Sequence, residues 1–251
     1  MNDHELLRYS RQIILPNFGY QNQEKLANAH VLLIGVGGLG SPAALYLASS
    51  GIGELSLVDF DQVELSNLPR QILHCEKNLN EKKIESAAKS LVEINSKIKL
   101  NLIDKKISSA QVLEQLCINA DITLDCSDNF ATRYAVNRAC VKTKSTLVTA
   151  AAVQFFGQLS SYDFSIADSP CYQCLCPDNE ATQEQVLTCA DNGILAPIVG
   201  TMGLLQALET IKIICGIDNN LNSKLLIFDG LDMSFRTLNI SKDKHCPVCN
   251  C

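Results

Sequence analysis

The sequence lacks three features that would assign it to common classes of protein: an excess of basic residues, an uninterrupted apolar segment and a secretory leader. It has 21 Lys and Arg against 27 Asp and Glu, giving a net charge of -6, and no clustered basic face of the kind that binds nucleic acid. The longest apolar region, residues 194–215, contains Glu209 and Lys212, which argues against a membrane span. Residues 1–5 are polar, unlike a signal peptide. We expect a cytoplasmic protein that binds neither nucleic acid nor membrane.

Internal repeats and low-complexity tracts are also missing from the 251 residues, so the chain is expected to form one large domain or two small ones. Hydrophobic residues make up 47% of the sequence, which is enough for a sizeable core. Cysteine, by contrast, is abundant, with 12 residues. In a reduced compartment, such cysteines are expected to bind metal or take part in chemistry.

Strands and helices alternate in the first half of the sequence, a pattern typical of a doubly wound parallel sheet. The predicted strands cover residues 31–34, 55–58, 98–103 and 121–126, and the predicted helices cover 5–14, 41–50, 81–94 and 130–142. Asn80 is the expected N-cap of the helix over 81–94.

The pattern changes after about residue 146. Here the sequence predicts strands over 146–153 and 157–164, a helix over 200–215 and a hairpin over 224–240. The fold class is therefore α/β, with a Rossmann-like nucleotide-binding half and a second half built on mixed or antiparallel sheet.

A glycine-rich segment, Gly35-Val36-Gly37-Gly38-Leu39-Gly40, follows the first predicted strand and opens a helix. Its glycines allow close backbone approach to phosphates at a helix N-terminus, and Asp59, at the end of the next strand, could accept from ribose hydroxyls. The pattern alone favours a nicotinamide nucleotide. The sequence has no P-loop of the G-x-x-x-x-G-K-[ST] type.

Several further motifs occur in the order found in the ThiF/MoeB/HesA family, bacterial relatives of the ubiquitin-activating enzymes, and the resemblance extends over essentially the whole chain. The motifs are Arg8-Tyr9-Ser10-Arg11-Gln12-Ile13, the glycine segment, Asp59, Ser66-Asn67-Leu68-Pro69-Arg70-Gln71, Lys83 and Asp125-Cys126-Ser127-Asp128-Asn129. The resemblance implies an ATP-dependent adenylation domain over residues 1–251, with a nucleotide-binding half at about 28–150 and a carrier-binding half at about 151–251. A nicotinamide-dependent oxidoreductase would leave Arg70, Lys83 and Asp128 without a role.

The family's functional residues can be carried over position by position. The resemblance implies that the nucleotide is bound by Gly35, Gly37, Gly38, Gly40, Asp59, Ser66, Asn67, Arg70, Lys83, Asp128 and Asn129. Arg70 and Lys83 would stabilise the polyphosphate, Asp128 would organise Mg²⁺, and Arg11 would reach the phosphates of a neighbouring subunit, which implies a homodimer. Pro69 stands where the family usually has glutamine, so no side-chain contact is expected there.

Two C-x-x-C pairs, Cys171/Cys174 and Cys246/Cys249, lie far apart in the sequence. Four thiolates could close a structural zinc site, although two turns or redox pairs would give the same spacing. The family resemblance implies that these four cysteines bind Zn²⁺. Cys176 and Cys251 extend the pairs, so either could replace a ligand.

The resemblance also implies a substrate and a second reaction. The substrate would be a small β-grasp sulfur carrier protein whose C-terminal glycine carboxylate is adenylated. A sulfur donor, such as a cysteine desulfurase or sulfurtransferase, would then allow thiocarboxylate formation. Cys189 matches a cysteine implicated in sulfur transfer in some members. Residues 40–48, 174–179 and 228–230 favour the thiamine branch, with the molybdopterin branch as the alternative.

Overall fold

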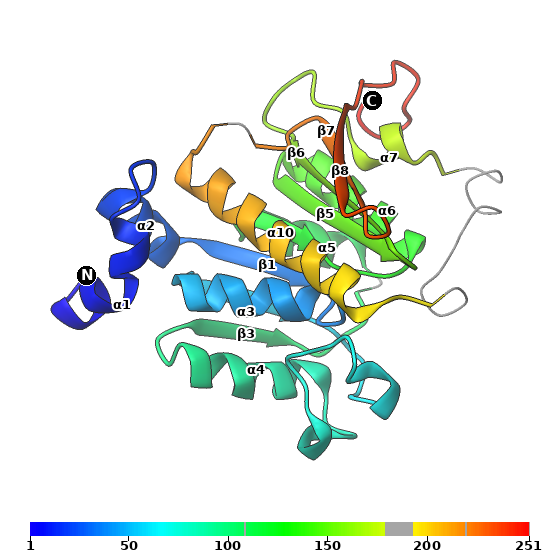
Figure 1. Ribbon diagram of the computed structural model, residues 1–251. Helices are drawn as coiled ribbons and strands as arrows, with labels where there is room; N and C mark the ends of the chain where they lie inside the picture. Colours follow the sequence, from blue (N-terminus) through cyan, green and yellow to red (C-terminus); the bar gives the residue numbers. More distant parts are fainter. Residues whose placement is uncertain (108, 179–192, 219, 251) are drawn as a thin grey trace.

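The computed structural model describes residues 1–107, 109–178, 193–218 and 220–250, which form an α/β fold around one eight-stranded sheet (Figure 1). The strand order is β3-β2-β1-β4-β5-β6-β7-β8. The strands are β1 (His30–Ile34), β2 (Glu54–Val58), β3 (Lys99–Ile103), β4 (Ile122–Asp125), β5 (Thr146–Val153), β6 (Phe156–Asp163), β7 (Lys224–Asp229) and β8 (Ser234–Asn239).

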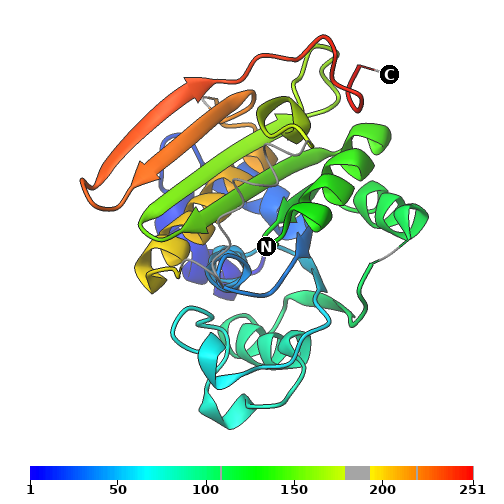
Figure 2. The same ribbon diagram turned by 90° about the vertical axis from the view of Figure 1, so that its right-hand side faces the viewer.

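The sheet changes from parallel to antiparallel at β5, which pairs parallel with β4 and antiparallel with β6. Figure 2 shows β5 to β8 lying side by side as one continuous surface. The expected change from a parallel first half to an antiparallel second half is confirmed, but the two parts share one sheet, and the division expected near residue 150 falls inside β5.

Helices lie on both faces of the central strands of the sheet. They are α1 (Asp3–Ile13), α2 (Gly19–Asn28), α3 (Gly40–Ser50), α4 (Lys83–Ile94), α5 (Ala110–Ile118), α6 (Phe130–Thr143), α7 (Tyr172–Leu175) and α10 (Ala196–Cys215), with short 3₁₀ turns at Leu65–Asn67 and Glu76–Asn78. Residues of α3, α4 and α10 belong to one buried cluster, and residues of α5 and α6 belong to a second.

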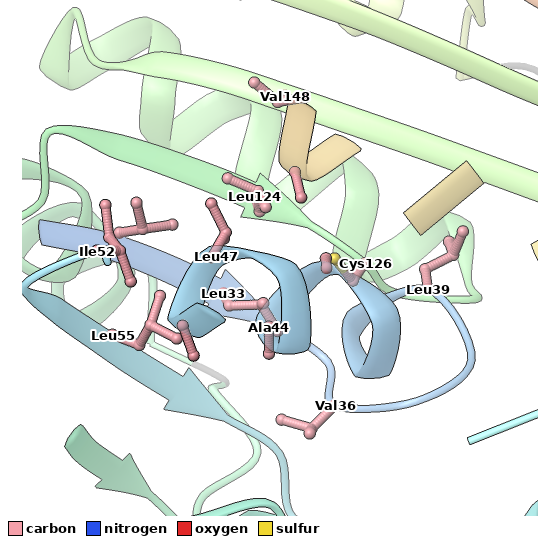
Figure 3. Close-up of a cluster of buried hydrophobic side chains, with 14 of the residues drawn as sticks. Leu33, Val36, Leu39, Ala44, Leu47, Ile52, Leu55, Leu124, Cys126 and Val148 are labelled. Atoms are coloured by element: carbon pink, nitrogen blue, oxygen red, sulfur yellow. The ribbon is translucent and has the colours of Figure 1, made fainter. Parts of the chain in front are cut away.

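Strand β1 is apolar from Val31 to Ile34 because it is covered on both faces. Val31 and Leu33 lie in the cluster under α3, drawn in Figure 3, whereas Leu32 and Ile34 lie in the cluster under α6. Successive side chains of a strand point to opposite faces, so a strand covered on both faces needs apolar residues at every position.

The 20-residue helix α10 is long and apolar enough to cross a membrane by composition, but half of its apolar window is buried in this fold. It packs against α3, β4, β5 and β6. It begins at Ala196, earlier than the predicted residue 200, because Pro197 is compatible with a first helical turn.

The prediction that Asn80 caps the following helix is wrong. Asn80 has a φ of 67°, its N–H donates to the Val63 carbonyl, and α4 begins at Lys83 instead. Residues 80–82 pair with 62–63, as shown by the Gln62–Lys82 bridge, so the backbone there is engaged before the helix can start.

Candidate functional site

The glycine segment lies at the carboxyl edge of the parallel strands, where β1 is flanked by β2 and β4. The chain moves outward from β1 through β2 to β3 and then returns to the other side of β1, which makes this edge the topological switch point where such sheets bind ligands. Gly35 has a φ of 92°, and a Cβ at Gly40 would lie 2.0 Å from the Gly35 carbonyl oxygen. Both positions therefore require glycine.

Asp59 leaves the same edge at the end of β2 and is buried. Its two carboxylate oxygens accept from the backbone N–H groups of Val36 at 2.8 Å and Asp61 at 2.9 Å. Burial raises the pKa of Asp59 above its ordinary value, while the nearby Lys83 ammonium acts in the opposite direction. The carboxylate is thus fixed beside the glycine segment, where ribose hydroxyls could donate to it.

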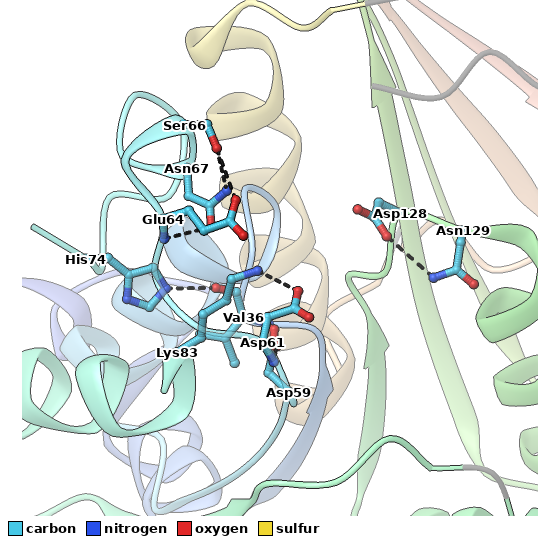
Figure 4. A network of polar contacts seen from close by, with 10 residues as sticks. All are labelled: Val36, Asp59, Asp61, Glu64, Ser66, Asn67, His74, Lys83, Asp128 and Asn129. Atoms are coloured by element: carbon cyan, nitrogen blue, oxygen red, sulfur yellow. Dashed lines mark hydrogen bonds and ion pairs between the residues drawn. The ribbon is translucent and has the colours of Figure 1, made fainter. Parts of the chain in front are cut away.

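Lys83 begins α4 and points its ammonium into this edge, as Figure 4 shows. The side chain is only 8% exposed, and Nζ lies 2.8 Å from Oδ2 of Asp61, a residue that is half exposed. A cation held at the glycine segment by an exposed carboxylate could exchange that partner for a phosphate.

The predicted segment 66–71 packs directly over the glycines. A Cβ at Gly38 would lie 3.5 Å from Cγ of Arg70, and the Arg70 guanidinium donates from Nη1 to the Ser66 carbonyl at 2.9 Å. Asn67 is buried, whereas the hydroxyl of the exposed Ser66 donates to Glu64 at 3.3 Å. The structure therefore brings Arg70 and Lys83 to the same loop.

Asp128 and Asn129 follow β4 on the other side of β1, apart from the Lys83 group in Figure 4. Asn129 Oδ1 caps α6 by accepting from the Thr132 N–H at 2.9 Å, and Nδ2 donates to Asp128 at 3.4 Å. The Asp128 side chain is exposed, so its carboxylate has the chemistry and the access to bind Mg²⁺.

The sequence analysis gave no role to three buried residues of this site: Gln71, His74 and Arg133. Arg133 donates to the Ser127 carbonyl at 2.5 Å and to Thr149 Oγ1 at 3.2 Å, which holds the loop that carries Asp128. Gln71 lies beside Gly37, and its Oε1 has no hydrogen-bond partner among the described residues. The only signal available in the sequence was that Gln71 ends the motif that contains Arg70, because burial is not visible in the sequence.

Arg11 does not reach the glycine segment of its own chain. It is exposed in the last turn of α1, where the neighbouring Gln12 donates to the Ser50 carbonyl at 3.2 Å, beside the end of α3. The glycine segment lies at the other end of α3, and an 11-residue helix is about 16 Å long. The position is compatible with the expectation that Arg11 acts on a neighbouring subunit.

The four predicted zinc ligands converge. Their sulfur atoms all lie within 4.8 Å of one another, with Sγ–Sγ distances of 3.6 Å for Cys171/Cys246, 3.9 Å for Cys171/Cys174 and 3.4 Å for Cys174/Cys249. These distances are too long for disulfides, and a zinc tetrahedron with Zn–S bonds of about 2.3 Å has edges of about 3.8 Å. The cluster could therefore hold Zn²⁺ in a closed, four-thiolate site.

The surroundings of this cluster suit bound thiolates. Backbone N–H groups of Cys171 and Asp243 point at Cys174 Sγ from 3.5 and 3.4 Å. Burial raises the pKa of the Cys171 thiol to about 11, a cost that a bound cation would remove by binding the thiolate. Cys176 is not part of the four-sulfur group, and Cys251 and Cys189 lie outside the described residues.

A glycine segment at the switch point, a carboxylate placed for ribose and two cations beside the loop define a nucleotide-binding α/β protein. Its sequence matches the ThiF family over residues 9–248, and the chain belongs to that family.

Sequence relatives are named for two activities. The chain is 47% identical to "Adenylyltransferase and sulfurtransferase MOCS3" of Aedes aegypti and 46% identical to the protein of that name in Dictyostelium discoideum. The alignments cover 100% and 99% of this chain but 56% and 58% of those proteins, so the chain spans little more than half their length.

Solved structures share the fold and include a nucleotide complex. The crystal structure of E. coli MccB with ATP superposes with a TM-score of 0.85 and 28% identity, over 99% of this chain and 75% of MccB. A complex of MccB with N-formylated MccA gives a TM-score of 0.83 and 27% identity, over 96% of this chain and 74% of MccB.

Proposed function

We propose that this protein uses ATP to adenylate the C-terminal glycine carboxylate of a small ubiquitin-like sulfur carrier protein. The observation that carries the proposal is the assembly of a phosphate loop, the Asp59 carboxylate, Arg70 and Lys83 at one edge of the sheet. The names of the relatives, which include adenylyltransferase, and the ATP complex of MccB support ATP over a nicotinamide nucleotide.

The reaction needs no nucleophile from the enzyme. A carboxylate oxygen of the carrier attacks the α-phosphorus, the bond from that phosphorus to the bridging oxygen breaks, and pyrophosphate leaves. Arg70 and Lys83 are placed to stabilise the negative charge on the phosphates, and Asp59 is placed to hold the ribose. Asp128 would hold Mg²⁺, which supplies additional charge stabilisation when bound.

The identity of the carrier is the finer part of the proposal. The sequence favoured the thiamine branch, but the relatives named MOCS3 support the molybdopterin alternative better. We therefore propose a carrier of the molybdopterin-synthase type as the substrate, with the thiamine carrier as the second candidate. Both are expected to present a flexible glycine tail to the site.

The test is isotope exchange between labelled pyrophosphate and ATP, with each candidate carrier added in turn. We expect exchange with the molybdopterin-type carrier and none with the same carrier lacking its terminal glycines. Faster exchange with the thiamine carrier would reverse the choice of branch. Absence of exchange with every carrier, together with binding of NAD, would refute the adenylation proposal.

The proposal includes two further partners, a second copy of the chain and a sulfur donor. We propose a homodimer, supported by the position of Arg11 remote from its own glycine segment. We also propose that the terminal sulfur of a persulfide on an external donor attacks the acyl carbon of the carrier acyl-adenylate and releases AMP, and that a thiol reductant then cleaves the resulting disulfide to free the thiocarboxylate. A role for Cys189 in that transfer remains a prediction from family resemblance.

A further inference from the structure

A buried histidine, His74, lies against the glycine segment although no motif pointed to it. Its side chain comes from the segment that follows Arg70, and the residue is only 6% exposed. In Figure 4 its ring points at Val36. His74 Nε2 lies 3.1 Å from the Val36 carbonyl oxygen, and Nδ1 lies 2.9 Å from Ser86 Oγ.

These two contacts determine the tautomer of the ring. A carbonyl oxygen can only accept, so Nε2 must carry the proton, and Nδ1 then accepts from the Ser86 hydroxyl. Burial lowers the pKa of His74 below its ordinary value and outweighs the bond to the Val36 carbonyl, which raises the pKa; the Lys83 ammonium lowers it further, and Asp59 acts in the opposite direction. The ring is therefore a neutral donor at physiological pH.

The Val36 residue is held from two sides. Its N–H donates to Asp59 Oδ2 at 2.8 Å, and its carbonyl accepts from His74. It lies between Gly35 and Gly37, which have no side chain to restrict the backbone. These two bonds fix the peptide groups on either side of the buried Val36, and the bonds from Gly35 N–H to the Val58 carbonyl at 2.8 Å and from Ser41 N–H to the Gly37 carbonyl at 2.9 Å hold the flanking residues.

The Val36 carbonyl belongs to the same planar peptide as the Gly37 N–H, and the two groups point in opposite directions across a trans peptide. By holding the carbonyl, His74 directs the Gly37 N–H away from itself. In a glycine-rich loop that opens a helix, backbone N–H groups are the groups that bind phosphate. Ser86 lies on α4, the helix that Lys83 begins, so the contact also links the loop to that helix.

We propose that His74 is a positioning residue for the nucleotide: its Nε2–H holds the Val36 carbonyl so that the Gly37 N–H is presented to a phosphate of ATP. The inference rests on the proposed use of ATP but not on the identity of the carrier. It adds to the site a side chain that lies beneath the loop and acts through the backbone.

The test compares His74→Leu, which removes the donor at similar bulk, with His74→Gln, whose amide can place an N–H near the position of Nε2. The dissociation constant for ATP is measured by calorimetry without carrier, and the KM values for ATP and carrier are measured by pyrophosphate exchange. His74→Leu should weaken ATP binding about 10-fold, as expected for one lost hydrogen bond. Its KM for the carrier should change less than about 2-fold, and His74→Gln should recover most of the affinity for ATP.

His30→Gln is the matched control, because His30 also bonds a backbone carbonyl and a serine hydroxyl but lies at the opposite end of β1. It should bind ATP like the wild type. If His74→Leu does not fold, Ser86→Ala tests the proposal indirectly: it removes the partner of Nδ1 that orients the ring, so the Nε2 bond to Val36 should weaken and ATP affinity should fall about 3-fold, and unchanged affinity would count against the proposal.

Two results would overturn the inference: unchanged ATP affinity in folded His74→Leu, or equal losses in the Leu and Gln variants. Because ATP binding is measured without carrier, a failure to activate any carrier would refute the proposed substrate and leave this test intact. If the wild type does not bind ATP, both proposals fail.

Discussion

Two consecutive lysines show how much a residue's surroundings decide its role. Lys82 and Lys83 are identical in chemistry, yet the Lys82 side chain is 47% exposed and pairs with Asp104 on the surface, whereas Lys83 is 8% exposed beside the glycine segment. An exposed ion pair contributes little, because water and salt screen it. A cation directed at a phosphate site can contribute much more to a transition state.

Lys83→Ala should therefore slow ATP–pyrophosphate exchange about 100-fold, a loss of about 3 kcal/mol of transition-state stabilisation. Lys82→Ala, the matched control, should stay within about 2-fold of the wild type. Exchange rates with saturating carrier give the comparison. Equal effects of the two substitutions would remove Lys83 from the phosphate site.

The lowered pKa of His74 predicts a pH dependence of stability. The unfolded chain takes up a proton at His74 near pH 6.5, while the folded chain resists it until a lower pH. Stability therefore includes the full contribution of His74 above pH 6.5 and loses it as the pH falls from 6.5 through the folded pKa. Urea unfolding of wild type and His74→Gln at pH 5 to 8 should show the difference between the two shrinking toward acid pH. A constant difference would contradict the lowered pKa.

At the residue level, the sequence identified those candidate site residues that occur at a fixed spacing along the chain. Gly35, Gly40 and Asp59 could be selected as candidates because a glycine-rich turn after one strand and an acid at the end of the next keep a fixed spacing in nucleotide-binding sheets. His74 could not be identified, because its partner Val36 is 38 residues away and nothing in the sequence links the two residues. Gln206 was missed for the same reason: it is fully buried in α10 and donates to the Asp125 and Val148 carbonyls at 2.9 and 3.1 Å.

At the level of elements, Gly203 of α10 lies in close contact with the start of α3. A Cβ at Gly203 would lie 2.2 Å from the Leu39 carbonyl oxygen, whereas a Cβ at Gly200, one turn earlier, would meet nothing within 4 Å. Leu39 is the last loop residue before α3. Gly203 thus sets how closely α10 packs against the start of the helix that follows the phosphate loop.

Gly203→Ala should destabilise the protein by about 2 kcal/mol or more, because backbone must move to relieve the contact. Gly200→Ala, in the same helix, should be neutral or stabilising by up to about 1 kcal/mol, because alanine favours the helix. Chemical denaturation measures both. A Gly203→Ala protein as stable as Gly200→Ala would show that α10 can shift freely.

The cysteine cluster joins two elements that are 75 residues apart in sequence, the short α7 and the tail after β8. Cys246→Ser should lower the melting temperature by roughly 6–12 °C, since about 3 kcal/mol shifts it by that amount in a chain of this size. A chelator should lower the wild-type value similarly but not that of Cys246→Ser. Cys75→Ser, which changes an exposed cysteine outside the cluster, should match the wild type. Less than one zinc per chain in purified wild type would contradict the site.

Most elements were predictable because burial on both faces gives apolar runs of strand length and glycines mark their ends. The start of α4 was not, because pairing of residues 80–82 with 62–63 is a tertiary contact that overrides the capping preference of Asn80. The sequence also did not predict that the sheet continues through β5. This strand pairs parallel with β4 and antiparallel with β6, and its sequence does not show which strands it pairs with.

Across the whole molecule, the predicted functional residues form two groups that lie at opposite ends of the parallel strands. The phosphate loop, Asp59 and Asp128 lie at the carboxyl edge of the strands, and Arg11 lies near the end of α3 remote from that edge. If Arg11 acts on ATP, it must therefore act on another copy of the chain. In a symmetric dimer, each copy could place its Arg11 in the site of the other copy, because a two-fold interface is the same for both subunits.

Mixing two inactive variants tests this arrangement. Arg11→Ala would remove the arginine given to the partner's site, and Lys83→Ala would disable the site of its own chain. Random reassortment of equal amounts gives one half heterodimers, in which one of the two sites is intact, so about a quarter of wild-type exchange activity should return. Each variant alone, and each mixed with itself after the same treatment, should remain inactive.

If Arg11→Ala alone keeps full exchange, Arg11 has no role in the reaction. If Arg11→Ala is inactive but the mixture stays inactive although heterodimers form, the arginine acts within its own chain, and α1 would have to move about the length of α3 to bring it there.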